Sequence, residues 1–156
     1  MITGVLPTAL TVSSMERSLS FYCDLLGFRQ ATQLPAEAER ERWDRYHEQV
    51  CGIPGARIRV VYLEAPDRTS HLELIEYERP KAANGPRRPF SEPGTAIVAL
   101  GLKDSEEVVE RLRSAGVEVV ADPVFYETDD GARSYTTYLY DPDGNALALF
   151  ETVEAA

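Results

Sequence analysis

The sequence predicts an α+β fold in which two βαβββ modules form curved mixed sheets around a cavity. A strand-like segment followed by a helix-like segment occurs twice, first from Ala9 and again from Val98. Further strand-like segments follow each helix, and a proline- and glycine-rich stretch at 85–89 separates the two halves. We therefore expect one domain, residues 1–156, built from a module at 4–80 and a module at 94–153, with residues 81–93 as the linker.

The first helix is expected to follow the strand at 9–12. Ser13 and Glu16 have the spacing of a capping box, and Gly27 is a suitable C-terminal stop. Apolar residues recur between them at helical spacing, which predicts the buried face: Met15, Leu19, Tyr22 and Leu26.

The second helix is expected to follow the strand at 98–102. Asp104 and Glu107 mark its beginning and Gly116 its end. The residues predicted to be buried are Val108, Leu112 and Ala115.

The later strands are expected at 58–63 and 72–77 in the first module, and at 135–140 and 146–150 in the second. Between the last two, Asp141 to Asn145 reads as a tight turn. Pro142 presets its own φ, and Gly144 supplies a position with positive φ. The sequence therefore predicts a β-hairpin near the C-terminal end of the second module.

The first module is longer than the second by about 15 residues, which places an insertion between its helix and its last strand. The segment from Pro35 to Val50 fits a helix, with proline in the first turn and an apolar face made of Trp43, Tyr46, His47 and Val50. Two roles are open for this helix: packing over a sheet edge, or serving as a lid over a substrate.

Four segments carry a resemblance to a known family: PTALTVSSMERSLSFYCDLLGF at 7–28, HLELIEYERP at 71–80, GTAIVALGLKD at 94–104, and the hairpin at 138–151. In this order they resemble the vicinal oxygen chelate superfamily, which includes glyoxalases, bleomycin-resistance proteins and extradiol dioxygenases. The resemblance implies the paired-module fold. It does not by itself imply one activity.

In metal-using members of that superfamily, four equivalent positions each supply a histidine or a carboxylate. The resemblance places these positions at Pro7, Glu73, Ile97 and Ala148, of which only Glu73 has a donor side chain. His71 lies two residues from Glu73 and shares its strand face, but two ligands from one strand make a poor metal cage. We therefore expect no metal ligands, no cofactor and a metal-independent function.

Glu73 is the strongest catalytic candidate. If it faces an apolar cavity, its carboxylate suits general-base chemistry in an isomerisation, elimination or cyclisation. Alternatively, Glu73 forms a salt bridge with Arg59 or is half-solvated at the cavity mouth. His71 is the second catalytic candidate, with a polar wall or rim position as the alternative.

Aromatic residues concentrate on the expected strands and suit a flat, largely apolar ligand. Most such residues build protein cores, so the ligand-binding interpretation applies to the aromatic residues as a group and not to any one of them. The predicted ligand-binding set combines three of the four equivalent positions with three of these aromatic residues. That set is Pro7, Ile97, Ala148, Tyr62, Tyr138 and Phe150.

Two function classes fit these residues. The first is a metal-independent isomerase, lyase or cyclase in which Glu73 acts as acid or base on a small apolar or aromatic metabolite. The alternative is a protein that binds and sequesters a small molecule such as an antibiotic. A metal-dependent glyoxalase or dioxygenase fits less well, because three of the four ligand positions lack donors.

The charge of the chain limits the classes of partner that the protein is expected to bind. The formal net charge of −10 and the lack of a basic stripe argue against nucleic-acid and anionic-membrane partners.

Cys23 and Cys51 lack metal-site spacing and suit a reducing compartment. The sequence has no signal-peptide pattern and no apolar run of 18 residues, which predicts a soluble cytoplasmic protein. Open sheet edges predict a homodimer, and the other expected partner is a small-molecule ligand.

Overall fold

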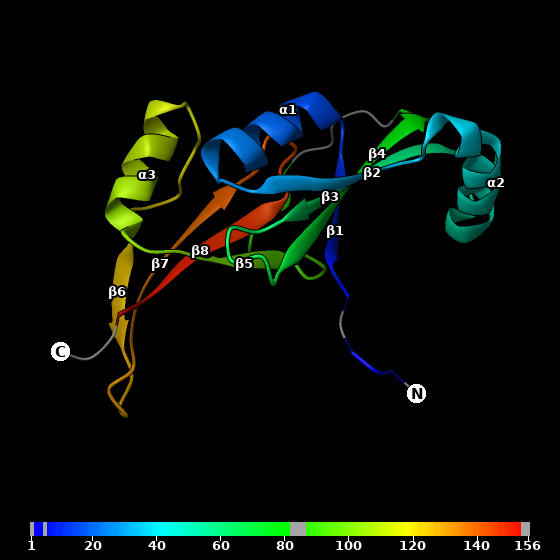
Figure 1. Ribbon diagram of the computed structural model, residues 1–156. Helices are drawn as coiled ribbons and strands as arrows, with labels where there is room; N and C mark the ends of the chain where they lie inside the picture. The colour runs from blue at the N-terminus through cyan, green and yellow to red at the C-terminus, as the bar shows by residue number, and fades with distance from the viewer. Residues whose placement is uncertain (1, 5, 82–86, 154–156) are drawn as a thin grey trace. The chain divides into compact units, whose positions relative to one another are not determined.

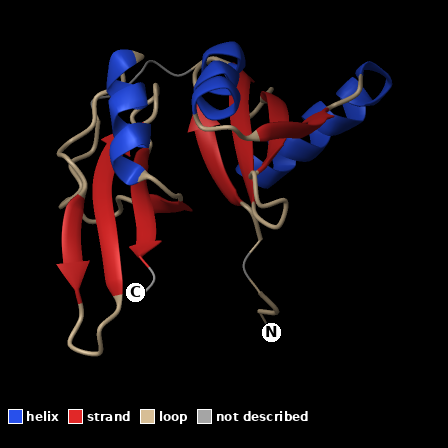
Figure 2. Ribbon diagram, turned by 60° about the vertical axis from the view of Figure 1, so that its left-hand side comes forward, coloured by secondary structure: helices blue, strands red, loops and turns tan. Residues whose placement is uncertain are grey.

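The computed structural model describes residues 2–4, 6–81 and 87–153. The chain divides into two compact units, unit 1 up to Gly85 and unit 2 from Pro86. Each unit contains one four-stranded mixed sheet with helical segments (Figures 1 and 2). The α+β class predicted from the sequence is therefore confirmed.

Unit 1 contains the following elements in chain order: β1 (Thr8–Val12), α1 (Met15–Leu19), η1 (Ser20–Leu25), β2 (Arg29–Leu34), η2 (Glu37–Glu39), α2 (Arg40–Cys51), β3 (Arg57–Glu64) and β4 (His71–Arg79). The strand order is β1-β4-β3-β2, with β1 parallel to β4 and the other pairs antiparallel. The side chains of Leu72, Leu74 and Glu76 are buried on one face of β4, and α1 packs against this strand.

Unit 2 contains β5 (Ile97–Gly101), α3 (Ser105–Ser114), β6 (Val124–Glu127), β7 (Arg133–Tyr140) and β8 (Ala146–Val153). Its strand order, β5-β8-β7-β6, repeats that of unit 1. The strand β5 is parallel to β8, as β1 is to β4. Leu139, Leu147 and Leu149 form the buried core of the sheet, to which α3 adds Val109 and Leu112.

The first helix differs from the prediction in its N-cap and in part of its buried face, whereas Gly27, with a φ of +78°, follows its end as expected. Its N-cap is Ser14, whose hydroxyl accepts from the Arg17 amide at 3.4 Å, and not Ser13. The segment Ser20–Leu25 is a π-helix, whose wider turn changes the buried face. The buried positions are Met15, Ser18, Phe21 and Tyr22, whereas Leu19 and Leu26 are half-buried.

The second helix buries Leu112 as predicted, but the rest of its buried face differs from the prediction. Val109 is buried, while Val108 is half-buried and Ala115 is exposed. The predicted cap Asp104 has a left-handed φ of +57° and makes no side-chain capping bond. The cap comes instead from β8, as described below.

The inserted segment forms a helix, but α2 begins at Arg40 and not at Pro35. A cis Leu34–Pro35 bond and the short 3₁₀ turn η2 precede it. The helix lies against β3, where the Trp43 Nε1–H donates to the Ile58 carbonyl at 2.9 Å. Ile58 lies beyond the end of β2, whose pairing stops at Leu34 and Val60. The helix therefore covers an edge of β3 that β2 leaves open.

The C-terminal hairpin agrees with the prediction. The Asp141 side chain is 1% exposed and accepts from the Asp143 and Asn145 amides at 2.9 and 2.8 Å. Gly144 has a φ of +85°, as the turn requires. Within the part of the chain that the structure describes, no helix is long and apolar enough to cross a membrane.

Candidate functional site

Glu73 and Tyr62 are opposite each other on β4 and β3 of unit 1. Because side chains alternate along a strand, both point to the sheet face opposite that of Leu72, Leu74 and Glu76. Both are half-buried. The sheet thus brings together one residue predicted to be catalytic and one predicted to bind ligand.

Tyr62 interacts with Glu73 through charge and hydrogen bonding. Partial burial raises the pKa of the Tyr62 phenol, and the negative charge of Glu73 and a side-chain hydrogen bond to it raise the pKa further. A phenol beside a carboxylate is held in its protonated form, in which it donates a hydrogen bond. This pair can remove and donate protons at one place on the sheet.

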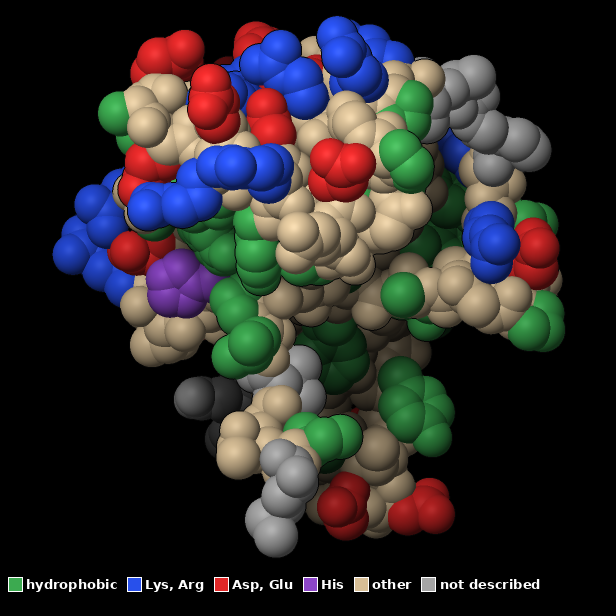
Figure 3. Space-filling view, turned by 90° about the vertical axis from the view of Figure 1, so that its right-hand side faces the viewer, with side chains coloured by type: hydrophobic (Ala, Val, Ile, Leu, Met, Phe, Trp, Pro, Cys, Tyr) green, Lys and Arg blue, Asp and Glu red, His purple; other side chains and the backbone are tan. Residues whose placement is uncertain are grey.

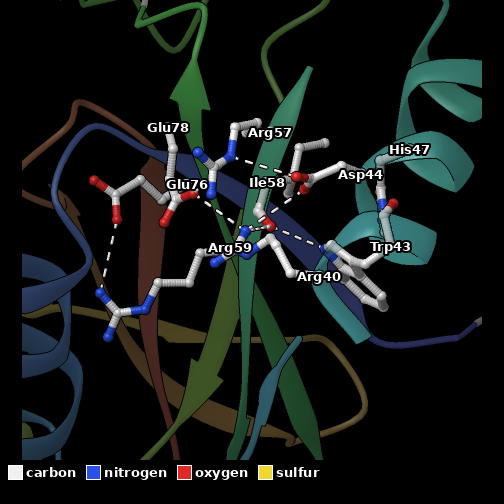
Figure 4. Close-up of polar contacts among 9 residues, drawn as sticks. All are labelled: Arg40, Trp43, Asp44, His47, Arg57, Ile58, Arg59, Glu76 and Glu78. Carbon is white, nitrogen blue, oxygen red and sulfur yellow. Dashed lines mark hydrogen bonds and ion pairs between the residues drawn. The ribbon is translucent and has the colours of Figure 1, made fainter. Parts of the chain in front are cut away.

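The alternative prediction, a salt bridge between Glu73 and Arg59, is wrong. Arg59 is opposite Glu76, which lies on the other face of the sheet. Its guanidinium bonds the Glu16 carboxylate at 2.5 Å and lies 3.9 Å from the Glu76 carboxylate (Figure 4). Strand register, which the sequence does not specify here, separates Arg59 from Glu73.

His71 is exposed at the beginning of β4, opposite Glu64. It shares the sheet face of Glu73 because the two are two residues apart. Pro7 is exposed and directly precedes β1. Both residues therefore lie toward the margin of this sheet.

The inserted helix α2 adds residues near the same face that sequence reasoning did not place there. Tyr46 is close enough to Tyr62 to contribute to the raised pKa of that phenol, after burial and Glu73. At the end of α2, Cys51 interacts with the Tyr77 hydroxyl, whose pKa is raised chiefly by partial burial. Tyr77 is on the Glu73 face of β4 because the two are four residues apart.

Ion pairs anchor α2 to the sheet (Figure 4). Arg40 lies 3.1 Å from Glu78 and 3.6 Å from Asp44, and Arg57 lies 3.3 Å from Asp44. The Nδ1 atom of His47 lies 3.1 Å from the Trp43 carbonyl, which directs the ring along the helix. Figure 3, viewed from the side where α2 lies in Figure 1, shows basic and acidic side chains interspersed, with hydrophobic side chains exposed beside a histidine.

In unit 2, four of the predicted ligand-binding residues share one sheet face. Tyr138 is opposite Ala148, while Ile97 is opposite Ala146 and Phe150 lies two residues beyond Ala148. Ala148 is 7% exposed, whereas Ile97, Tyr138 and Phe150 are 39%, 38% and 41% exposed. The small side chains of Ala146 and Ala148 leave the sheet surface lower there than at the larger side chains around them.

Sequence reasoning did not identify Phe90, which covers part of this face. Its ring lies 4.9 Å from the Tyr138 ring and 4.6 Å from the Tyr140 ring, centroid to centroid. The separation between Phe90 and β7 in the sequence is long, and only the folded chain shows the contact.

Two hollows lie on the described part of unit 2. One, of about 440 Å³, lies where β5 ends and is lined in part by Gly101, Phe150 and Thr152. The other, of about 420 Å³, lies at the beginning of α3 and is lined by Asp104, Ser105, Glu106, Glu107, Tyr135 and Glu151. The first contains one of the predicted ligand-binding residues, Phe150.

The sequence model of the Glyoxalase/Bleomycin resistance protein/Dioxygenase superfamily matches residues 4–149. The chain belongs to this superfamily. Among its relatives, the Catechol-2,3-dioxygenase of Bacillus subtilis (strain 168) is 29% identical over 144 residues, covering 90% of this chain and 39% of that protein. The chain therefore spans about two fifths of the length of this curated relative.

Solved structures of the superfamily share the fold. A glyoxalase family protein from Bacillus cereus superposes with a TM-score of 0.78 at 23% identity, covering 99% of each chain. The trypanothione-dependent glyoxalase I of Leishmania major gives a TM-score of 0.62 at 20% identity, covering 96% of this chain and 87% of that chain. At these identities the likeness shows the fold alone.

The residues at the four positions that the resemblance equates with metal ligands do not supply the donor set of a catalytic metal. Pro7, Ile97 and Ala148 have hydrocarbon side chains, so Glu73 is the one donor among the four. Within residues 2–4, 6–81 and 87–153, no three His, Cys, Asp or Glu side chains come together in a possible metal site. A catalytic zinc generally takes three protein ligands, and this donor set falls short of that number.

Proposed function

We propose that the protein is a metal-independent enzyme of the superfamily, an isomerase, lyase or cyclase in which Glu73 is the general base. The observation that carries this proposal is the pairing of Glu73 with Tyr62 on the sheet face opposite that of Leu72, Leu74 and Glu76. A carboxylate and a protonated phenol at one place supply a proton acceptor and a hydrogen-bond donor.

The chemistry follows from these two groups. Glu73 removes a proton from a carbon next to a carbonyl, and the C–H electron pair becomes the double bond of an enolate. The Tyr62 hydroxyl donates a hydrogen bond to the enolate oxygen, where negative charge develops. The protonated Glu73 then returns the proton to another carbon or to a departing group. No step requires a metal or a redox partner.

The substrate class is a small apolar or aromatic molecule with a carbonyl group. Tyr62 lies beside Glu73 and Tyr46 lies near Tyr62, so aromatic rings are available next to the carboxylate, which favours a flat ligand. The name of the Bacillus subtilis relative also points to a single-ring aromatic compound. His71 is proposed as a polar contact at the margin of this site.

The proposal is tested by proton exchange. The protein is incubated in D₂O with a panel of small aromatic ketones, and deuterium incorporation next to the carbonyl is followed by NMR. Glu73→Gln should lower the exchange rate by about 10²-fold or more while binding is retained, because the amide keeps the shape but is no base. Tyr62→Phe should lower it by a smaller factor.

Glu48→Gln is the matched control, because Glu48 is an exposed carboxylate on α2. Its exchange rate should equal that of the wild type. An unchanged rate in Glu73→Gln would end the general-base proposal.

A second function, non-catalytic binding of a small molecule such as an antibiotic, is favoured by a different observation. The face made by Tyr138, Ala148 and Ile97 in unit 2 has aromatic walls and no acid or base at its floor. Under this function Glu73→Gln changes ligand affinity little. Tyr138→Ala instead costs about 1 kcal/mol or more of binding free energy.

We also propose that the protein is a cytoplasmic homodimer without nucleic-acid or membrane partners. The strands β1, β2, β5 and β6 are sheet edges, which a second copy can cover. The net charge of −10 disfavours polyanionic partners.

A further inference from the structure

The Tyr138 and Tyr140 rings form an aromatic platform on unit 2. Tyr138 is opposite Ala148, and Tyr140 is opposite Ala146. Because the two tyrosines are two residues apart on β7, their rings project from the same face, beside the two small alanine side chains. The platform therefore presents two flat ring surfaces beside the small alanine side chains.

Phe90 is the side chain that occupies this platform. Its ring stacks on the Tyr140 ring at 4.6 Å with an interplanar angle of 23°, and lies 4.9 Å from the Tyr138 ring at 38°. These separations and tilts are those of favourable aromatic pairs. Phe90 is thus placed as a ring of a bound aromatic ligand would be.

The segment that carries Phe90 is a strap, residues 87–95, with no helix or strand of its own. The strap is held in part by hydrogen bonds: the Tyr140 hydroxyl donates to the Arg88 carbonyl at 3.0 Å, and the Glu92 amide and the Thr95 amide and hydroxyl close turns within the strap. The Arg87 guanidinium lies 5.1 Å from the centroid of the Tyr140 ring and pairs with Glu118. Contacts with the Tyr140 side chain therefore help to hold the strap, together with the close packing of Arg87 against Gly144.

The corresponding place in unit 1 is built differently. Tyr62 is opposite Glu73 there, as Tyr138 is opposite Ala148 in unit 2. One tyrosine has a carboxylate partner, whereas the other has alanine and an aromatic ring stacked on it. A tyrosine therefore occupies the equivalent position in both units, but its neighbours differ between them.

We infer that the Tyr138–Tyr140 platform is a binding site for a planar, uncharged aromatic ring, and that Phe90 is an internal competitor that leaves the platform when such a ring binds. The ligand class follows from the surroundings. Two phenol rings and two alanine methyl groups favour an apolar flat molecule, and the guanidinium beside the Tyr140 ring, that of Arg87, is already paired with Glu118.

Competition makes the free protein bind weakly, because the intramolecular ring must first be displaced. Removing Phe90 should then tighten binding. The aromatic contacts that Phe90 makes with two rings correspond to a gain of at least about fivefold in affinity. This inference rests on the second proposed function, small-molecule binding at the Tyr138 face of unit 2, and does not depend on Glu73.

The test uses 2-naphthol, an uncharged two-ring probe, and measures its Kd by fluorescence titration for the wild type and for Phe90→Ala. Phe90→Ala should bind at least about fivefold more tightly, and adding Tyr138→Ala should remove the gain. Phe125→Ala is the matched control, because Phe125 is 46% exposed on β6 and contacts Tyr135 at 5.3 Å. Its Kd should equal that of the wild type.

A second measurement uses the wild-type protein, so that it does not depend on how the variants fold. Stacking shifts the ring-proton NMR signals of Phe90, and saturating 2-naphthol should move them to positions typical of an exposed ring. Phe90 signals that stay in place at saturation, or a Phe90→Ala affinity that is unchanged or weaker, would overturn the inference. The Glu73→Gln exchange experiment reads a different site and is unaffected by either result.

Discussion

Replacement of Glu151 tests how β8 holds α3 in unit 2. The Glu151 carboxylate accepts from the Asp104 amide at 2.9 Å and from the Ser105 amide at 3.0 Å. These amides belong to the first turn of α3, where backbone N–H groups have no partner within the helix. A strand side chain thus serves as the N-cap that Asp104 does not provide.

The expected magnitude follows from the two bonds. Loss of an N-cap side chain costs about 0.5–2 kcal/mol, and the negative charge at a helix N-terminus adds about 0.3–1 kcal/mol at exposed sites. Glu151 is half-buried, so Glu151→Ala should lower the free energy of unfolding by about 1–2 kcal/mol. Glu151→Gln keeps the shape and should cost about half as much.

The effect should depend on pH in a defined direction. Hydrogen bonds from Ser105, first its hydroxyl and then its amide, and the bond from the Asp104 amide hold the pKa of Glu151 below its usual value. A carboxylate whose folded-state pKa is lowered stabilises the fold fully above the unfolded value of about 4.3. This stabilisation is lost as the pH falls through the lower folded-state pKa. The cost of Glu151→Gln should therefore be largest near pH 7 and disappear in acid.

The assay is urea unfolding followed by far-UV circular dichroism at pH 7 and in acid, with hydrogen exchange of the Asp104 and Ser105 amides as a local readout. Glu110→Gln is the control, because Glu110 is exposed in the middle of α3. Equal stability of Glu151→Gln and wild type at pH 7, or a difference that persists in acid, would refute the reasoning.

Three further predictions concern packing, metal content and assembly. Trp43→Phe removes the N–H that bonds the Ile58 carbonyl and should lower stability by about 0.5–1.5 kcal/mol, measured by chemical denaturation. Purified protein should contain no stoichiometric Zn, Fe, Mn or Ni by elemental analysis; about one metal per chain that is lost in Glu73→Ala would contradict this. Light scattering after size exclusion should give the mass of a dimer, and a monomer at micromolar concentration would contradict the proposed assembly.

Much of the fold could be predicted from short stretches of sequence. The turn from Asp141 to Asn145 forms as expected because proline, glycine and a short carboxylate each act on the backbone within a few residues. Periodicity located the helices but predicted their buried faces only in part: Met15, Tyr22 and Leu112 are buried as expected. The choice of Val109 over Val108 depends on packing against the sheet, and the π-helical turn at Ser20–Leu25 alters the periodicity itself.

The candidate site could be predicted only in part. The donor count at the four equivalent positions is a property of the sequence, as is the presence of Glu73. The partner of Glu73 cannot be read from the sequence, because a shift of one residue in strand pairing would place different β3 side chains on the Glu73 face of β4. Arg59 and Tyr62 were both available on β3, and the register places Tyr62 opposite Glu73.

The sequence by itself determined the repeated strand–helix pattern, the C-terminal hairpin and the absence of side-chain donors at Pro7, Ile97 and Ala148, since each depends on residue type and near neighbours. The tertiary structure decided that Tyr62 faces Glu73, that Glu151 caps α3 from β8, and that Phe90 stacks on Tyr138 and Tyr140. These contacts join residues 11 to 50 positions apart. They form only when strand register and loop path bring distant segments together, and local propensity does not encode that arrangement.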